Sequence, residues 1–404
     1  MIAIEKMIAA NRADCCGCYA CYNSCPFDAI TMEEDTEGFR YPRVDADRCR
    51  NCGKCERNCP VLNPIVKEQE RTPPTYAAIN KNETIRKDSS SGGMFQLFAE
   101  QILKEGGIVF GAGFDADWEV CHQSVETVAD LERLRVSKYL QSRVETSFQQ
   151  VTEHLRAGRK VLFAGAPCQC AALRRFVGKN DENLILVDFI CHGVPSPKIW
   201  RNYLALRANK KEIRRISFRN KNLSWERFLL AISYGNANKY LAADLTTDLY
   251  LQGFLQNLYL RPSCHSCHFC KKNRPSDITL ADFWGVQEES PSMYDGKGTS
   301  LIFIQSSKGR DLFNQVKDHA KIMEQDFDRA ILHNPSMITS SKPSPKREAF
   351  FQDVQRDEMD FMKLLYEYTK LPFKTRVNQQ VRRWVRKIPG AVAFVHMVKG
   401  RRRL

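Results

Sequence analysis

Two runs of cysteines with identical spacing lie in the first sixty residues. They are Cys15-x2-Cys18-x2-Cys21-x3-Cys25-Pro26 and Cys49-x2-Cys52-x2-Cys55-x3-Cys59-Pro60. Three thiolates in a CxxCxxC loop can wrap around one cuboidal cluster of iron and sulfur, and the fourth iron is then reached from a distance. The proline removes a backbone N–H and keeps a following helix from starting early. The spacing therefore predicts iron–sulfur clusters in this part of the chain.

The same pattern is typical of bacterial ferredoxins, in which the fourth cysteine of each run binds the cluster of the other run. This rule predicts two [4Fe–4S] clusters. One would be held by Cys15, Cys18, Cys21 and Cys59, and the other by Cys49, Cys52, Cys55 and Cys25. The alternatives are structural zinc, which favours paired CxxC motifs, and disulfides. Short strands are expected at 29–32 and 41–44.

A third group of cysteines begins at Cys264. Cys264, Cys267 and Cys270 repeat the CxxCxxC spacing, but Arg274-Pro275 stands where a ferredoxin has Cys-Pro. A cluster at this place must therefore recruit a distant cysteine.

Two distant cysteines each follow an apolar segment that reads as a strand. Cys168 follows the strand expected at 161–164, and Cys191 follows the strand expected at 184–189. If these strands are parallel neighbours, both cysteines leave the carboxyl edge of one sheet, where open α/β sheets bind ligands. The preferred ligands of a third [4Fe–4S] cluster are therefore Cys168, Cys191, Cys264 and Cys267. The competing set is Cys264, Cys267 and Cys270 with Cys168 or Cys191, and zinc or free thiols are the alternative.

No catalytic role is predicted for the remaining cysteines or for the histidines near the third group. Cys16, Cys121 and Cys170 are interpreted as small buried residues or bystanders. His192, His265 and His268 neighbour the third group, where each either donates to a cluster sulfur, serves as a proton source or is an ordinary polar neighbour.

The elements that must position these residues follow from the apolar pattern. After a polar, proline-bearing stretch comes a strand at 75–79, and Ser89-Ser90-Ser91-Gly92-Gly93 then opens an amphipathic helix over 94–103. A G-x-G-x-x-A pattern at 111–116 is followed by a turn and a strand, which argues against a Rossmann site. Further helices are expected at 127–134, 142–156, 169–176, 244–258 and 309–317, and strands at 108–110, 213–218, 228–234, 277–283 and 300–304.

The net charge of +14 is concentrated at the C-terminal end. Residues 371–404 contain ten Lys or Arg and no Asp or Glu, which leaves +4 on the first 370 residues. This tail is expected either to form a basic amphipathic helix that contacts anionic lipid or an acidic partner, or to be solvated. No signal peptide or membrane span is recognised, and thiolate-held clusters favour a reducing compartment, so a cytoplasmic location is expected. No nucleic-acid partner is expected.

From residue 75 to about 320 the chain resembles the beta subunit family of coenzyme F420 hydrogenase and dehydrogenase. The matching segments are Ser90-Ser91-Gly92-Gly93, Ser137-Lys138-Tyr139 with Gln141-Ser142, Gly165-Ala166-Pro167-Cys168-Gln169, Cys191-His192-Gly193-Val194-Pro195-Ser196-Pro197, Arg261-Pro262-Ser263-Cys264 with Cys267, 277–285 and 298–301. Ala166 and Ala281 stand where the family commonly has threonine and glycine. The resemblance implies FAD, a cluster within the flavin domain, and electron exchange with a deazaflavin or another two-electron partner.

The resemblance also implies where FAD would bind. Carried over by position, the candidates are Ser90, Ser91, Gly92, Gly93, Ser137, Lys138, Tyr139, Gly165 and Pro167. Small residues let the backbone approach a ligand, and glycines before a helix present N–H groups to a pyrophosphate. Without the resemblance, 90–93 would read as an ordinary helix N-cap.

We therefore expect an α+β protein, with an N-terminal bacterial ferredoxin-like domain of βαβ pseudo-twofold type and an α/β flavin-binding module with a mixed sheet. The expected parts are 1–66 (ferredoxin-type domain with two [4Fe–4S] clusters), 67–74 (linker), 75–158 and 159–330 (N- and C-terminal regions of the beta subunit module) and 331–404 (helical, basic tail).

The expected function is that of an iron–sulfur flavoprotein oxidoreductase. Clusters carry one electron at a time and hydride acceptors take two, whereas a flavin can do both. The expected partners are a ferredoxin-like donor or a partner redox subunit, and a two-electron acceptor, coenzyme F420 or another. The alternative is a non-catalytic iron–sulfur adaptor that delivers electrons to a partner enzyme, as in surface-polysaccharide biosynthesis.

Overall fold

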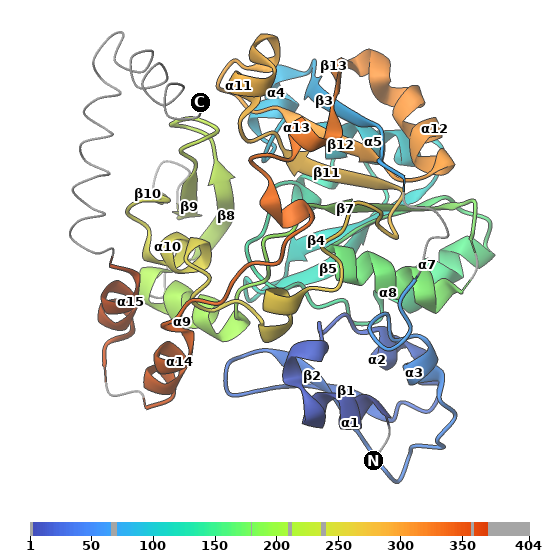
Figure 1. Cartoon of the computed structure of the whole chain (residues 1–404), viewed down its shortest axis with the longest axis vertical. Helices are drawn as coiled ribbons and strands as arrows, with labels where there is room; N and C mark the ends of the chain where they lie inside the picture. Colours follow the sequence, from blue (N-terminus) through green and yellow to red (C-terminus); the bar gives the residue numbers. More distant parts are fainter. Residues whose placement is uncertain are drawn as a thin grey trace, which may run out of the picture.

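The computed structural model describes residues 3–65, 71–178, 180–208, 212–235, 240–356 and 359–370. Figure 1 shows the cysteine-rich N-terminal part in dark blue below a large sheet with helices, and a smaller sheet with its own helices to one side. Residues 67–70 of the expected linker and the basic segment 371–404 lie outside the described residues.

The N-terminal part consists of three short helices and one two-stranded ribbon. They are α1 (Ala3–Ala10), α2 (Ala20–Ser24), β1 (Ile30–Glu34), β2 (Arg40–Val44) and α3 (Lys54–Arg57). β1 and β2 pair antiparallel, with Ile30 opposite Val44, which confirms both strands expected here. The expected βαβ order is wrong, because the residues before the first cysteine run form α1. Its sequence AIEKMIAA is rich in good helix formers.

The large sheet has eight strands in the order β13-β3-β12-β11-β7-β6-β4-β5. Their bounds are β3 (Thr75–Asn80), β4 (Ile108–Phe114), β5 (Val120–Val125), β6 (Val161–Ala164), β7 (Leu184–Phe189), β11 (Ile278–Asp282), β12 (Ser300–Ile304) and β13 (Ala320–Gln325). The four central strands β4, β6, β7 and β11 run parallel, and antiparallel strands extend the sheet on both sides. The expected mixed sheet is therefore confirmed.

Apolar side chains of this sheet are covered by helices on both faces. α5 (Met94–Lys104) and α12 (Ser307–Val316) pack on one core, and α7 (Ser147–Arg156) and α8 (Pro167–Val177) pack on another. Short helices complete this body: α4 (Glu83–Lys87), α6 (Leu131–Leu134), α11 (Val286–Glu289) and α13 (Phe327–Ala330).

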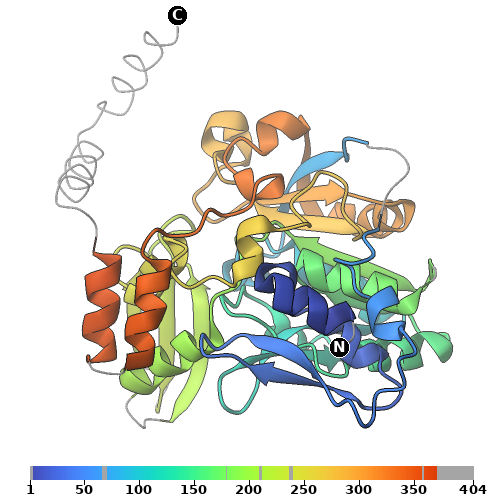
Figure 2. The same cartoon turned by 60° about the horizontal axis from the view of Figure 1, so that its bottom comes forward.

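The smaller sheet is antiparallel, in the order β10-β9-β8, with bounds β8 (Ile213–Asn220), β9 (Leu229–Tyr234) and β10 (Tyr240–Asp244). It packs with α9 (Pro197–Ala208), α10 (Leu249–Leu255), α14 (Arg347–Arg356) and α15 (Phe361–Thr369). α14 and α15 lie side by side next to this sheet (Figure 2). No helix in the described ranges is both long and apolar enough to cross a membrane.

Three expected helices are shorter than the pattern indicated, because strand pairing or turns take the place of their ends. The helix expected at 142–156 begins at Ser147, since Arg143 pairs with β5 through two backbone hydrogen bonds, to Val120 O (2.9 Å) and from His122 N (2.8 Å). The helix expected at 244–258 shrinks to α10, since Asp244 ends strand β10. The helix expected at 127–134 is reduced to α6.

The glycine pattern at 111–116 lies in a hairpin. Gly111 and Gly113 are part of β4, which turns back as the antiparallel strand β5. The turn and strand expected after the pattern are therefore confirmed, and no helix starts among these described residues, as a Rossmann fingerprint would require.

Candidate metal centres and cofactor cavity

The first cysteine run meets the last cysteine of the second run in one cavity. Cys15, Cys18, Cys21 and Cys59, the inner cysteine set, all line it. Burial raises the pKa of the Cys59 thiol to about 11, so a thiolate here needs a compensating positive charge. Iron supplies that charge and deprotonates the thiols that bind it, so this donor set fits a cluster.

The second run meets Cys25 in a separate cavity. Cys25, Cys49, Cys52 and Cys55, the outer cysteine set, line it together with Lys6, Arg50 and Lys54. Cys52 is exposed to solvent, whereas Cys15, Cys18 and Cys59 are each only 8% exposed. Each cavity thus contains three cysteines of one run and the fourth of the other. That these eight thiols are the cluster ligands stays a prediction.

The third cysteine group lies at the carboxyl edge of the large sheet. Cys168 follows β6 and Cys191 follows β7, and the two strands are parallel neighbours. Both thiols line a central cavity of about 650 Å³, together with Cys264, Cys267 and Cys270. Burial raises the pKa of Cys191 to about 12. Both ligand sets considered for a third cluster therefore converge on one space.

Cys16 occupies a position that the sequence did not predict. It lines both the inner cavity and the central cavity, and its thiol contacts those of Cys18 and Cys168. Cys170, by contrast, is fully buried in the core and donates to Gly165 O. The only sequence signal for Cys16 is the Cys-Cys doublet within the first run.

Arg274 stands where a ferredoxin run would have its fourth cysteine. Its side chain is 1% exposed and lies 3.7 Å from the carboxylate of Asp188, at the end of β7. It also donates to the carbonyl oxygens of Phe189 (3.0 Å) and Met337 (3.3 Å). Arginine here therefore ties the segment to the sheet edge and cannot act as a ligand.

Two of the three histidines near the third group are bonded to protein groups. His192 Nε2 lies 2.6 Å from Asn257 Oδ1, and His265 Nδ1 lies 2.8 Å from Ser341 O. His192 and His268 line the central cavity.

Eight of the nine residues carried over for FAD line the central cavity: Ser90, Ser91, Gly93, Ser137, Lys138, Tyr139, Gly165 and Pro167. The two serine segments also touch, because Ser137 N donates to Ser90 Oγ (2.7 Å). Gly92 is not among the lining residues. A Cβ there would lie 2.4 Å from Ala78 O and 2.7 Å from Ser300 N, so Gly92 allows the loop to pack closely on β3 and β12.

Two helix starts and two arginines form a part of the cavity wall that suits an anionic group. Helices α5 and α8 both begin there, after Gly93 and Ala166, and helix N-termini favour anions. Arg135 and Arg219 also line the cavity, and the Nε atom of each is buried without a hydrogen-bond partner in the described part of the chain. Because unpartnered buried N–H groups are costly, a pyrophosphate would fit here.

Aromatic side chains line the same space. Tyr139 stacks on Phe254 with ring centroids 4.7 Å apart, and Trp284 stacks on Trp225 at 4.7 Å and 10°. These rings give flat apolar walls of the kind that planar cofactors contact.

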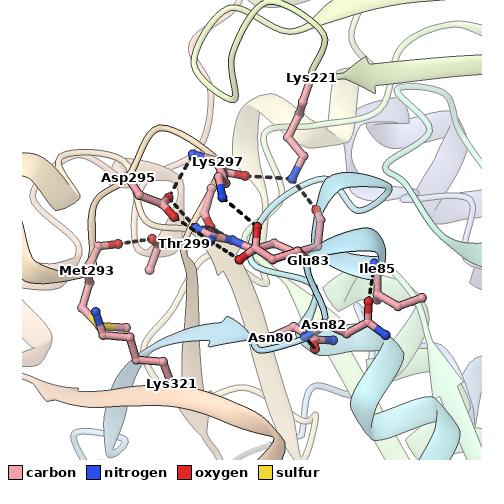
Figure 3. A network of polar contacts seen from close by, with 12 residues as sticks. Asn80, Asn82, Glu83, Ile85, Lys221, Met293, Asp295, Lys297, Thr299 and Lys321 are labelled. Atoms are coloured by element: carbon pink, nitrogen blue, oxygen red, sulfur yellow. Dashed lines mark hydrogen bonds and ion pairs between the residues drawn. The ribbon is translucent and has the colours of Figure 1, made fainter.

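A polar network around Lys221 reaches the Ser89–Gly93 loop, and Figure 3 shows the part of this network that includes Asp295 and Lys297. The Nζ atom of Lys221 donates to the carbonyl oxygens of Arg86 (2.6 Å), Ser91 (3.0 Å) and Lys297 (2.9 Å). Arg86 is 2% exposed and pairs with Asp295 at 2.6 Å. Neither residue was predicted, because partners so distant in sequence leave no local signal.

Comparison with known families gives a match for the cysteine-rich N-terminal part and a match for a large part of the chain that follows it. Residues 158–330 match the family model for the C terminus of the coenzyme F420 hydrogenase/dehydrogenase beta subunit, and residues 14–63 match the 4Fe-4S dicluster domain. Residues 158–330 belong to the coenzyme F420 hydrogenase/dehydrogenase beta subunit family. The N-terminal part is a ferredoxin-type 4Fe-4S dicluster domain.

Curated proteins are similar to short stretches of this chain. The B component of the Na(+)-translocating ferredoxin:NAD(+) oxidoreductase complex of Acetobacterium woodii is 43% identical over 73 residues, 16% of this chain and 21% of that component. An uncharacterized ferredoxin of Methanocaldococcus jannaschii is 33% identical over 73 residues, 17% of this chain and 91% of the ferredoxin. The chain thus spans about a fifth of the first relative.

Among solved structures, a chain of the F420-reducing [NiFe] hydrogenase complex from Methanosarcina barkeri, studied by xenon derivatization, matches with a TM-score of 0.43 and 18% identity. The match covers 75% of this chain and 95% of that chain.

Proposed function

We propose that this chain is an iron–sulfur flavoprotein oxidoreductase that passes electrons between a one-electron donor and a two-electron acceptor. The observation that carries the proposal is the central cavity, which is lined both by the third cysteine group and by the residues carried over for FAD. A cavity of about 650 Å³ is within the usual range for cofactor sites. FAD, when bound, supplies the exchange between single electrons and electron pairs.

Each wall of the central cavity has a proposed role. Arg135, Arg219 and the starts of α5 and α8 would hold the pyrophosphate, and Tyr139 and Trp284 would flank the rings. A third [4Fe–4S] cluster would be held by Cys168, Cys191, Cys264 and Cys267. The contacts of Cys16 with Cys18 and Cys168 support short separation between the inner cysteine set and this cluster.

Solvent exposure supports a direction of entry. Cys52 faces solvent, so a ferredoxin-like donor or a partner redox subunit would deliver electrons to the outer cysteine set first. They would continue through the inner set and the third cluster to the flavin. The two-electron acceptor is proposed to be coenzyme F420 or a related hydride acceptor, as the description of the family matched by residues 158–330 suggests. We also propose a reducing, cytoplasmic setting and the domain limits 1–66, 75–158, 159–330 and 331–404.

Anaerobic purification of the full chain with iron and flavin quantification tests the proposal. Three [4Fe–4S] clusters require about twelve irons per chain, with one FAD. Cys52→Ser is expected to lower ferredoxin-linked turnover at least about 100-fold and to leave FAD content unchanged, because the entry cluster is lost while the cavity is intact. A chain that binds clusters but no flavin would instead be the electron-transfer adaptor.

A further inference from the structure

Arg261 is a buried cation that the proposed function does not use. It precedes the third cysteine group, yet its side chain reaches into the N-terminal domain and is 0% exposed. Figures 1 and 2 both show the chain between α10 and β11 lying beside the dark blue N-terminal part. In the sequence, Arg261 is part of a segment that resembles the family, and no role is predicted for it.

The Arg261 guanidinium is directed at one residue of the inner cysteine set. Its Nε donates to Cys15 O (2.9 Å), and one terminal nitrogen lies 3.8 Å from Cys15 Sγ and 3.0 Å from Arg40 O. The other terminal nitrogen donates to Gln141 Oε1 (3.1 Å). The group also lies 4.2 Å from the centre of the Tyr41 ring.

No carboxylate forms an ion pair with Arg261 among the residues that the structure describes. A fully buried charge without an opposite charge is strongly unfavourable. The anion closest to hand is the Cys15 thiolate with the cluster that it would ligate. The inner cluster, when bound by Cys15, would therefore supply the counter-charge that Arg261 lacks.

Among the described residues that line its cavity, the outer cysteine set has no buried cation comparable with Arg261. The cations that line its cavity, Lys6, Arg50 and Lys54, are all exposed. Charges in water are screened far more strongly than a charge in a buried site. The two cluster sites of one domain thus differ in solvent exposure and in one buried positive charge.

We propose that Arg261 raises the reduction potential of the inner cluster above that of the outer cluster and so directs electrons inward. Reduction adds one negative charge to a cluster, and a buried cation with a hydrogen bond to a ligand sulfur stabilises that charge. In the transfer step the outer cluster loses one electron and the inner cluster gains it, with no bond or proton change. The electron enters from a ferredoxin-like one-electron donor.

This inference rests on the iron–sulfur domain and is independent of whether flavin binds. The test is an EPR-monitored redox titration of the anaerobically purified full chain. Cys52→Ser removes the outer cluster, so the N-terminal transition that survives belongs to the inner cluster. In the unchanged chain, the inner cluster is expected to titrate at the higher potential. The reverse order would overturn the proposal without any change at Arg261.

The decisive variant is Arg261→Gln, which removes the charge but keeps a hydrogen-bonding side chain. At the potential where half of the inner cluster is reduced in the unchanged chain, the variant is expected to show at least a tenfold lower reduced-to-oxidised ratio. Such a ratio corresponds to about 59 mV for a one-electron couple. Arg261→Lys keeps the charge and is expected to retain most of the original potential.

Arg12→Gln is the matched control. Arg12 lies 4.6 Å from the centre of the same Tyr41 ring, but its side chain is 53% exposed and it pairs with Asp35. Arg12→Gln removes one positive charge from the solvent-exposed surface, so the reduction potentials of both clusters should be unchanged. Equal potentials in Arg261→Gln and the unchanged chain, with full iron content, would refute the inference. If Arg261→Gln loses its iron, two measurements still test the inference. They are the potential of the inner cluster in Arg261→Lys and the order of the inner and outer potentials in the unchanged chain.

Discussion

At the scale of single residues, the contact between Gly17 and Arg261 shows how closely the two parts of the chain fit. Gly17 lies between Cys16 and Cys18, with φ of +62°. A Cβ at this position would lie 2.8 Å from Cζ of Arg261 and from Nε2 of Gln141. Glycine is therefore required both by the backbone conformation and by the approach of the guanidinium.

Gly17→Ala should separate these two requirements. The positive φ alone costs an alanine about 1 kcal/mol, and the clash with a buried side chain adds about 1–3 kcal/mol. Gly158→Ala is the control, because Gly158 has a φ of +73° but no atom within 4 Å of an added Cβ. Denaturant unfolding under anaerobic conditions is expected to show the larger loss of stability for Gly17→Ala. Equal losses of stability in the two variants would mean that a methyl group at residue 17 does not clash with Arg261.

His122 gives a pH dependence. It is 7% exposed, with Nδ1 2.8 Å from Ser142 Oγ and Nε2 3.2 Å from Ala164 O, and burial lowers its pKa to about 4. An unfolded chain takes up the proton near pH 6.5, whereas the folded chain does not until about pH 4. The stability that neutral His122 contributes is therefore fully present above about pH 6.5 and is lost as the pH falls toward 4.

Between pH 7.5 and 5.5 this group should remove about 1 kcal/mol from the free energy of unfolding. His122→Gln, which cannot titrate but can keep both hydrogen bonds, should show a smaller loss over the same range in urea unfolding. The same slope in both proteins would assign the acid sensitivity to other groups.

At the scale of elements, the apolar pattern predicted the strands that carry the site better than the elements around them. β6 and β7 are parallel neighbours as expected, so Cys168 and Cys191 meet at one edge. Short buried strands between clear breakers leave a strong local signal. The start of α7 and the existence of β13 depend on pairing with distant strands, and local pattern contains no information on that pairing.

The residues of the candidate site divide in the same way, into those that local spacing predicts and those that depend on distant contacts. Cysteine spacing brought together the two N-terminal sets, because a cluster needs its ligands at fixed separations along the chain. Cys16, Lys221 and Arg261 could not be found in this way. Each of them acts across more than 100 residues, on Cys168, Arg86 and Cys15 respectively.

The Lys221 network yields a prediction for the loop Ser89–Gly93. Lys221→Met removes three hydrogen bonds from a charged donor to carbonyl oxygens, each worth about 1.5–3 kcal/mol at most when buried. We expect faster amide exchange in this loop and a flavin affinity at least about tenfold lower, which is about 1.4 kcal/mol.

Lys81→Met is the control for that variant. Lys81 is exposed and donates to one carbonyl oxygen, that of Asp318. It should leave both amide exchange in the Ser89–Gly93 loop and flavin affinity unchanged. An unchanged loop in Lys221→Met would show that strand pairing alone is enough to hold it.

At the scale of the whole molecule, burial orders the three thiol-lined cavities. The outer cysteine set includes an exposed cysteine, the inner set is largely buried, and the third group lies at the sheet edge in the central cavity. Cys16 lines two of these cavities, which places them next to each other. A carrier protein can therefore approach the outer set most closely, and the surface there decides which carrier binds.

The exposed cations around the outer set predict an acidic carrier. Lys6, Arg50 and Lys54 line that cavity, and charges at the rim of an interface mainly change association rate and salt dependence. Arg50→Glu combined with Lys54→Glu should raise the KM for reduced acidic ferredoxin at least about tenfold at low salt. The difference should shrink as the screening length falls to about 3 Å near 1 M salt.

Lys104→Glu with Lys87→Glu makes the same charge change on α5 and α4, in the large-sheet body, and should leave this KM unchanged. Reduction by dithionite, which needs no protein docking, separates binding from damage to the cluster. If the paired substitution at Arg50 and Lys54 slows dithionite as much as ferredoxin, the cluster itself is altered. If the KM is the same in both double variants at every salt concentration, the carrier enters elsewhere and the order of the cavities does not define the route.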